Sequence, residues 1–210
     1  MRCLLIFGAS RGTGAQVVKY AQQQGYRCVA VVRNKESYDY LQSLGVEVIL
    51  GDANDEQVVT QACSLAGTDC TIISTLGGKQ ANYQPQCNII NHAEKQGIKR
   101  MILVSSLGCG DSWVTLSKRA KQAFGNSVRE KTFAEVWLQT SQLDYCIFRP
   151  GGLMDGEPTH HAQCYVQQEV HGYIMRSDLA LAILQRAAQP SLQAAIFSII
   201  DPQLIVERNK

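Results

Sequence analysis

Three glycines near the start of the chain have the spacing of a phosphate-binding turn. Residues 2–7 form a short apolar run, Gly8-Ala-Ser-Arg-Gly-Thr-Gly14 follows, and a helical pattern begins after it. A glycine-rich turn between a buried strand and a helix brings unpaired backbone N–H groups and the positive helix end to one point. We expect a dinucleotide diphosphate there, with contacts from Gly8, Ser10, Arg11, Gly12, Thr13 and Gly14.

The residue that ends the second expected strand points to the type of dinucleotide. Residues 27–32 are apolar after Arg27 and are followed by Arg33. An acidic residue at this position would accept from the ribose 2′-OH of NAD, whereas a basic one suits a 2′-phosphate. Arg33, with Arg11 as a second candidate, therefore predicts NADP(H). The alternative is that Arg33 is an ordinary solvated residue at a strand end.

The next two strand ends supply further candidates for the cofactor. Asp52 and Ala53 follow the third strand and are expected beside the adenine, although Asp52 is equally suited to a turn or a helix cap. Leu76 and Gly77 follow the fourth strand and are expected along the ribose and nicotinamide. Lys79 is a candidate for a phosphate or the substrate, or else a solvated lysine in a flexible turn.

The later strand ends are expected on the substrate side. Ser105 and Ser106 offer hydroxyl groups near the nicotinamide. Trp113 provides either a stacking face for a substrate or a loop anchor on the core. The segment 150–153 is expected to present backbone groups, with Pro150, Gly151 and Leu153 on the cofactor and Gly152 towards the substrate.

Strands and helices alternate along the chain, which predicts a Rossmann-type α/β fold, a doubly wound parallel sheet with helices on both faces. We expect one domain over residues 1–210, with 153–175 as an irregular lid that holds a small hairpin. Three local features are also predicted: a helix cap at Asn54, a break near Gly125 in the helix over 116–140, and core positions for Phe133 and Trp137.

Composition narrows the class of partner. The formal net charge of +2 gives no electrostatic reason to expect nucleic acid, and no apolar run has the length of a membrane span. The eight cysteines are scattered and contain no C-x-x-C pair, which predicts reduced thiols in a cytoplasmic location and no metal site. No signal sequence is expected, because the chain starts directly with the first strand. His160 and His161 are expected as exposed loop residues. The partner expected is a small molecule, and the protein a monomer or weak homo-oligomer.

Several motifs together resemble the atypical short-chain dehydrogenase/reductases with an NAD(P)H-binding, NmrA-like domain. Within that group the chain is similar to the flavin reductase/biliverdin-IXβ reductase branch. The resemblance covers nearly all 210 residues and is carried by Gly8–Gly14, Val-Val-Arg33, Gly51-Asp52, Val104-Ser-Ser106, and Lys131-x-x-Ala-Glu135 through Tyr145-x-x-x-Arg149-Pro-Gly-Gly-Leu153. By position it implies cofactor contacts from Gly8, Ser10, Arg11, Gly12, Thr13, Arg33, Asp52, Ala53, Leu76, Gly77, Ser106, Pro150 and Leu153.

One departure from the group bears on the chemistry. Catalytic members carry Tyr-x-x-x-Lys, but here Ser127 precedes Lys131 in the place of the tyrosine. Without that phenol, proton transfer to a ketone oxygen has no evident donor. A planar conjugated acceptor, a flavin or a biliverdin-like tetrapyrrole, can instead take hydride from NADPH and a proton from water. Ser106 and Lys131 are the expected catalytic residues, and a non-catalytic NADP(H)-binding redox sensor or assembly factor is the alternative.

Overall fold

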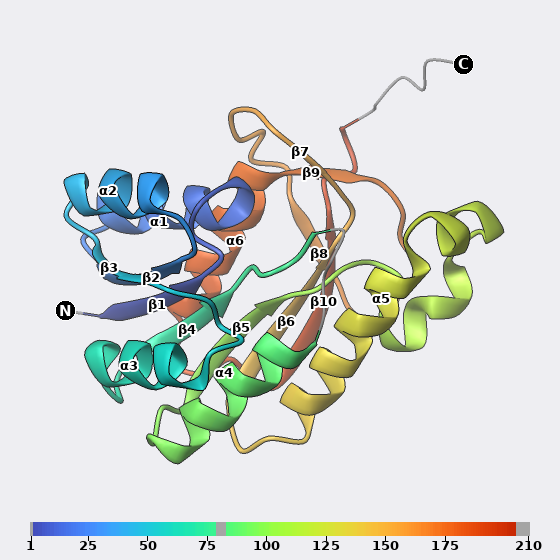
Figure 1. Cartoon of the computed structure of the whole chain (residues 1–210). Coiled ribbons are helices and arrows are strands. Elements are labelled where there is room, and N and C mark those ends of the chain that lie inside the picture. Colours follow the sequence, from blue (N-terminus) through green and yellow to red (C-terminus); the bar gives the residue numbers. More distant parts are fainter. Residues whose placement is uncertain (1, 79–82, 205–210) are drawn as a thin grey trace.

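The computed structural model describes residues 2–78 and 83–204 and contains one large sheet with helices on both faces (Figure 1). The strand order in this sheet is β3-β2-β1-β4-β5-β6-β10-β8, and β8 is antiparallel to its neighbour while the other pairs are parallel. The chain builds outwards from β1 to β3 and then returns to the other side of β1 with β4. The predicted doubly wound sheet is therefore confirmed, with its reversal of strand order between β1 and β4.

Apart from β8, which was not predicted, the strands of the large sheet lie close to the predicted positions. They are β1 (Cys3–Phe7), β2 (Arg27–Val32), β3 (Glu47–Leu50), β4 (Thr71–Ser74), β5 (Arg100–Val104), β6 (Asp144–Pro150), β8 (Gln163–Tyr165) and β10 (Ala195–Ile200). Two short strands, β7 (Gly152–Met154) and β9 (Tyr173–Met175), form a separate parallel pair. The central strands are buried over their whole length, as expected for a parallel sheet covered on both faces.

The helices divide between the two faces of the sheet. One face carries α1 (Gly12–Gln23), α2 (Lys35–Ser43) and α6 (Arg176–Ala187), and the other carries α3 (Glu56–Ala66), α4 (Gln84–Lys95) and α5 (Lys118–Gln139). A short 3₁₀ helix, η1 (Gly110–Thr115), precedes α5. Among the described residues, no helix combines the length and the apolar character that a membrane span requires.

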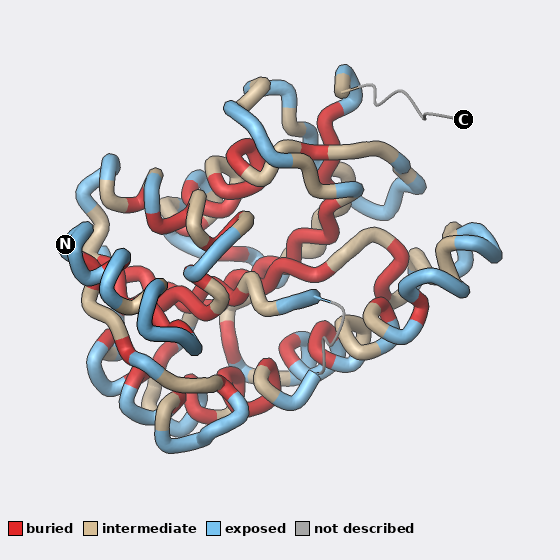
Figure 2. The backbone as a smooth tube through the Cα atoms, turned by 45° about the horizontal axis from the view of Figure 1, so that its top comes forward, coloured by how far each residue is buried: buried red, intermediate tan, exposed pale blue. Residues whose placement is uncertain are grey.

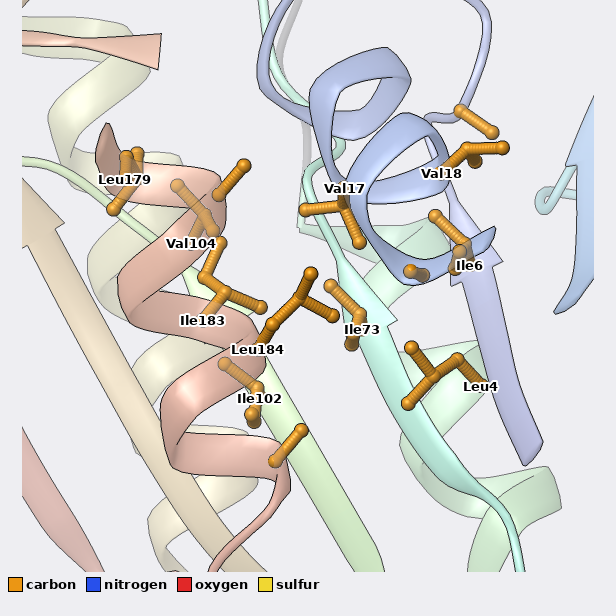
Figure 3. Close-up of a cluster of buried hydrophobic side chains, with 14 of the residues drawn as sticks. Leu4, Ile6, Val17, Val18, Ile73, Ile102, Val104, Leu179, Ile183 and Leu184 are labelled. Atoms are coloured by element: carbon orange, nitrogen blue, oxygen red, sulfur yellow. The ribbon is translucent and has the colours of Figure 1, made fainter. Parts of the chain in front are cut away.

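Each face of the sheet has its own hydrophobic core. In Figure 3, Val17 of α1 and Ile183 of α6 point towards side chains of the central strands such as Ile73. Phe7 and Ile72 point to the opposite face, where they pack with residues of α3, α4 and α5. Figure 2 shows the result, with buried segments through the middle of the molecule and exposed segments along the outer sides of the helices. Alternation along each strand thus supplies both cores.

The predicted break in the long helix is wrong. Helix α5 runs without interruption through Gly125, which is buried. A Cβ atom at Gly125 would lie 3.2 Å from Cη2 of Trp113, so the glycine makes room for the indole of η1. Lys121 and Arg129 of α5 lie over the same ring, with Lys121 Nζ 5.3 Å from its centroid. Trp113 is thus a packing residue between η1 and α5.

The predicted core positions of Phe133 and Trp137 are also wrong. Phe133 is 59% exposed and Trp137 45% exposed, because α5 turns a different stripe, which includes Ala134 and Leu138, towards the sheet. The indole of Trp137 instead lies at the surface, where its Nε1–H donates to Asn91 of α4. Helical spacing groups residues on one face but does not say which face is covered.

The lid segment holds three short strands, but it does not form the expected hairpin. In this segment, β7 pairs with β9 in parallel, and β8 pairs with β10 at the edge of the large sheet.

The cap of α3 also differs from the prediction by one residue. Asp55 accepts from the N–H of Gln57, whereas Asn54 donates to Asp52 in the preceding turn.

A buried ion pair ties α5 to β6. Both Glu135 and Arg149 are almost fully buried, and three hydrogen bonds of 2.7–3.2 Å join them. Arg149 also contacts the exposed Asp111 of η1, and this contact lowers the pKa of Asp111. Burial alone would lower the pKa of Arg149, but the hydrogen bonds and charge of Glu135 raise it above its ordinary value. Arg149 of β6 thus contacts both Glu135 of α5 and Asp111 of η1.

Removing one partner of this pair should be costly. We expect Glu135→Ala to lower the free energy of unfolding by about 3–5 kcal/mol, because the buried charge of Arg149 would keep only the exposed Asp111 as its partner. Urea unfolding measures the change. Lys35→Ala, which breaks an exposed pair with Asp39, is the control and should change stability little. A loss below about 1 kcal/mol for Glu135→Ala would contradict this role.

Candidate dinucleotide-binding site

The carboxyl ends of β1 and β4 meet at the reversal of strand order, where open α/β sheets bind their ligands. Thr75 lies directly after β4, and its N–H and Oγ1 donate to the carbonyl of Phe7, while Oγ1 also reaches that of Gly8. A Cβ atom on Gly8 would lie 2.7 Å from Thr75 Oγ1, and one on Gly14 would collide with the carbonyl oxygen of Gly8. Only glycine fits at these two positions, so the turn packs directly on β4.

A cleft of about 640 Å³ opens above this point and extends to both sides of it. Thirteen of the sequence-predicted residues line it: Gly8, Ser10, Arg11, Gly12, Thr13, Arg33, Asp52, Ala53, Leu76, Gly77, Ser105, Lys131 and Leu153. They come from the ends of β1, β2, β3, β4, β5 and β7 and from α5. The structure thus brings together residues that lie far apart in the sequence along one elongated cavity.

The start of α1 has the features of an anion-binding helix end. The helix begins at Gly12, whose φ of +59° suits glycine, and the side chain of Arg11 makes no capping hydrogen bond. No acidic residue occupies the first turn. The first N–H groups of a helix lack partners within it, and its N-terminus carries partial positive charge. A diphosphate would supply both the acceptors and the negative charge.

The end of the cleft expected to hold the adenosine contains the basic residue predicted for a 2′-phosphate. The side chain of Arg33 is 75% exposed, and its NH1 lies 3.7 Å from Oδ2 of Asp52. Asp52 has the turn role considered above, since its Oδ1 accepts from both N–H groups of Asn54. Asp52 also lines the cleft, so it has the turn role and at the same time the position expected of an adenine contact.

The opposite end of the cleft contains a partly buried lysine side chain. Lys131 Nζ donates to the carbonyl oxygen of Ser105 at 3.0 Å, and a Cβ atom on Gly77 would lie 3.4 Å from the same nitrogen. Burial lowers the pKa of Lys131, although the charge of Glu135 opposes the shift. The hydroxyl of Ser105 donates to Sγ of Cys109, whose thiol pKa is raised by burial.

Several predicted residues lie outside the cleft lining. Gly14 packs behind the turn, and Trp113 lies on α5 as described above. Ser106 follows Ser105 but is not among the lining residues, and its carbonyl oxygen accepts from the N–H of Cys109. The segment Pro150–Gly152 forms a packed corner: a Cβ atom on Gly151 would meet Ile200 at 2.9 Å, and one on Gly152 would meet Tyr173 at 2.5 Å. Lys79 lies outside the described residues.

The cleft also contains residues that the sequence did not single out. Gln86, Glu130, Asp155 and Arg176 all line it. No local signal marked Arg176 or Asp155, since they reach the site only through the pairing of β7 with β9.

These features fit a dinucleotide, and comparison with known proteins agrees. The sequence pattern of the NAD(P)H-binding family matches residues 8–190. The chain belongs to this family. Its NAD(P)H cofactor, predicted from the glycine turn, is thereby confirmed, as is the resemblance to the atypical short-chain dehydrogenase/reductases. The match begins at Gly8, the first residue of the turn that carries the expected diphosphate site.

Three similar proteins illustrate the range of this NAD(P)H-binding family. The chain is 50% identical in sequence to ChuY, an anaerobilin reductase from Escherichia coli O157:H7, and the two structures superpose with a TM-score of 0.94. The comparison covers 99% of this chain and 100% of that one. It is 25% identical to YhfK of Bacillus subtilis, an uncharacterized sugar epimerase, over 94% of both. It is 27% identical to the photosystem II assembly factor Ycf39 of Trieres chinensis over 73% of this chain, and spans 46% of Ycf39.

The position of Lys131 predicts a pH-dependent affinity for the cofactor. Its positive charge favours an anionic dinucleotide and is lost as the pH rises through a pKa below the ordinary 10.5. We expect the Kd of NADPH to increase as the pH is raised towards 10.5, because Lys131 loses its proton below that pH. Lys131→Met should remove this dependence. Lys131→Arg should move it to higher pH. Calorimetric titrations from pH 7 to 10 measure it, and an identical profile for wild type and Lys131→Met would contradict the role.

Proposed function

We propose that the protein is an NADPH-dependent reductase that transfers hydride to a planar conjugated acceptor, a linear tetrapyrrole in the first place. The observation that carries the proposal is the 50% identity with ChuY over 99% of this chain, together with a cleft that fits a dinucleotide. A flavin is the second acceptor class to test. Hydride transfer to a tetrapyrrole or a flavin needs no tyrosine as proton donor, because a nitrogen of the acceptor can take a proton from water. This agrees with Ser127, which stands here in the position of that tyrosine.

The residues of the cleft have separate tasks in this proposal. When bound, NADPH supplies the hydride, and water supplies the proton. The turn at Gly12 and Thr13 holds the diphosphate, and Arg33 pairs with the 2′-phosphate. Lys131 donates to the carbonyl of Ser105 and lies beside Gly77, on the side of the cleft expected to hold the nicotinamide. Catalysis then depends mainly on stacking the acceptor on the cofactor and on orientation.

Ycf39 suggests the alternative of a non-catalytic NADP(H)-binding assembly factor. One assay separates the two functions: oxidation of NADPH, followed at its near-ultraviolet absorbance without oxygen, in the presence of a linear tetrapyrrole or of FMN. Turnover with the tetrapyrrole that exceeds turnover with FMN supports the proposal. Tight NADPH binding without turnover on any of these acceptors would support the alternative.

Arg33 should determine the preference between the two dinucleotides. We expect Arg33→Ala to weaken NADPH binding about tenfold while leaving NADH nearly unchanged, since only NADPH has the 2′-phosphate. The expected effect is at the low end for a charged hydrogen bond because the side chain is largely exposed. Calorimetric Kd values for both dinucleotides measure it. Equal weakening of both would show that Arg33 does not contact the 2′-phosphate.

The two serines after β5 can be separated by kinetics. In our proposal Ser106 bonds the carboxamide or the acceptor, so Ser106→Ala should lower the single-turnover rate of hydride transfer more than it lowers NADPH affinity. Ser105→Ala is the matched comparison, because Ser105 lines the cleft and its hydroxyl contacts Cys109. A loss confined to Ser105→Ala would assign the role to Ser105 and remove Ser106 from the mechanism.

A further inference from the structure

Arg176 lies directly against the turn at the start of α1. It is the first residue of α6, which packs beside α1, and its side chain is 27% exposed in the wall of the cleft. A Cβ atom on Gly12 would lie 3.3 Å from Arg176 Nε and 3.4 Å from its Cδ. The guanidinium therefore lies beside the backbone N–H groups that are expected to hold the diphosphate.

The orientation of Arg176 is set by Asp155. Met154, the last residue of β7, pairs with Met175, the last residue of β9. The residues that follow the two strands, Asp155 and Arg176, therefore lie side by side. Asp155 Oδ2 accepts from NH1 of Arg176 at 2.9 Å, while Asp155 itself is 84% exposed. NH1 thus pairs with Asp155, while Nε is the guanidinium nitrogen that lies next to Gly12.

This arrangement places two sources of positive charge together. The N-terminus of α1 carries partial positive charge, and a cation beside it is unfavourable unless an anion lies nearby. Within the described residues, the ion-pair partner of Arg176 is the largely exposed Asp155, and the first turn of α1 contains no acid. A diphosphate between the turn and the guanidinium would compensate both charges, and a planar guanidinium suits two phosphate oxygens at once.

The same helix end holds the lid. Ser177 Oγ donates to the carbonyl of Gly156, and Asp178 accepts from the N–H groups of Thr159 and His160. Three successive residues, Arg176, Ser177 and Asp178, thus bind three points of the segment 155–160. Of the three, Arg176 is the one that also lies against Gly12.

We propose that Arg176 binds the diphosphate of the dinucleotide and that Asp155 is the residue that positions it. The pair links the segment 155–160 of the lid to the presence of the cofactor. This inference rests on the proposed function only in taking NAD(P)H as the ligand of the cleft, and it is independent of the acceptor.

The diphosphate is common to NADPH and NADH, which gives the inference a distinctive test. We expect Arg176→Ala to raise the calorimetric Kd of both dinucleotides by the same factor, about tenfold or more. Arg119→Ala removes one positive charge from an exposed position of α5 outside the cleft and should leave both values unchanged. Thermal unfolding of the apo proteins checks the fold, and Arg176→Gln replaces the alanine variant if that variant is unfolded.

The outcomes are distinct. Values for Arg176→Ala within twofold of wild type, or weakening of NADPH alone, would overturn the inference while the proposed function stands. An unchanged Kd with a raised KM for the acceptor would also overturn it, because Arg176 would then face the acceptor. If wild type bound neither dinucleotide, the proposed function would fail as well.

The positioning role of Asp155 has a separate readout. Asp155→Asn should raise the KM for NADPH while leaving kcat nearly unchanged, and Asp155→Glu should recover most of the affinity. Hydrogen exchange of the segment 155–160 should slow on addition of NADPH in wild type, and much less so in Arg176→Ala. Exchange that slows equally in both proteins would contradict the link between cofactor and lid.

Discussion

The architecture of the site depends on one close contact, between the glycine turn after β1 and Thr75 after β4. Gly8 and Gly14 leave no room for a Cβ atom there, so the turn lies against the neighbouring strand and α1 begins immediately beyond it. The contact occurs where the strand order reverses, and neighbouring connections diverge to opposite faces of the sheet. The unpaired N–H groups of α1 are therefore presented at the centre of an open cleft.

The two ends of the cleft differ in what they present. Towards the adenosine end, Arg33 is exposed and contacts Asp52 only loosely, which leaves its guanidinium available to an anion. Towards the other end, Lys131 is partly buried, which lowers its pKa, and it donates to the carbonyl of Ser105. Behind it, the buried pair of Glu135 and Arg149 fixes α5 against β6. The side expected to hold the nicotinamide is therefore lined by hydrogen-bonded, partly buried groups, whereas the side expected to hold the phosphate-bearing ribose has an exposed arginine.

The sequence predicted the sheet, the glycine turn and most of the cleft lining, because strand ends in this topology converge on one edge. It failed where tertiary packing decides. Gly125 was interpreted as a helix break, but it accommodates Trp113. The spacing of Phe133 and Trp137 placed them on one stripe without revealing that this stripe is exposed. Arg176 reaches the turn at Gly12 only through the register of β7 with β9, which no local pattern encodes.

The central claim is that the diphosphate lies on the turn that begins α1. A crystal structure of the complex with NADP⁺ tests it most directly. The account predicts diphosphate oxygens within hydrogen-bonding distance of the N–H groups of Gly12 and Thr13, with the 2′-phosphate at Arg33. A dinucleotide bound elsewhere, or bound in the cleft with its adenosine half next to Lys131, would contradict it.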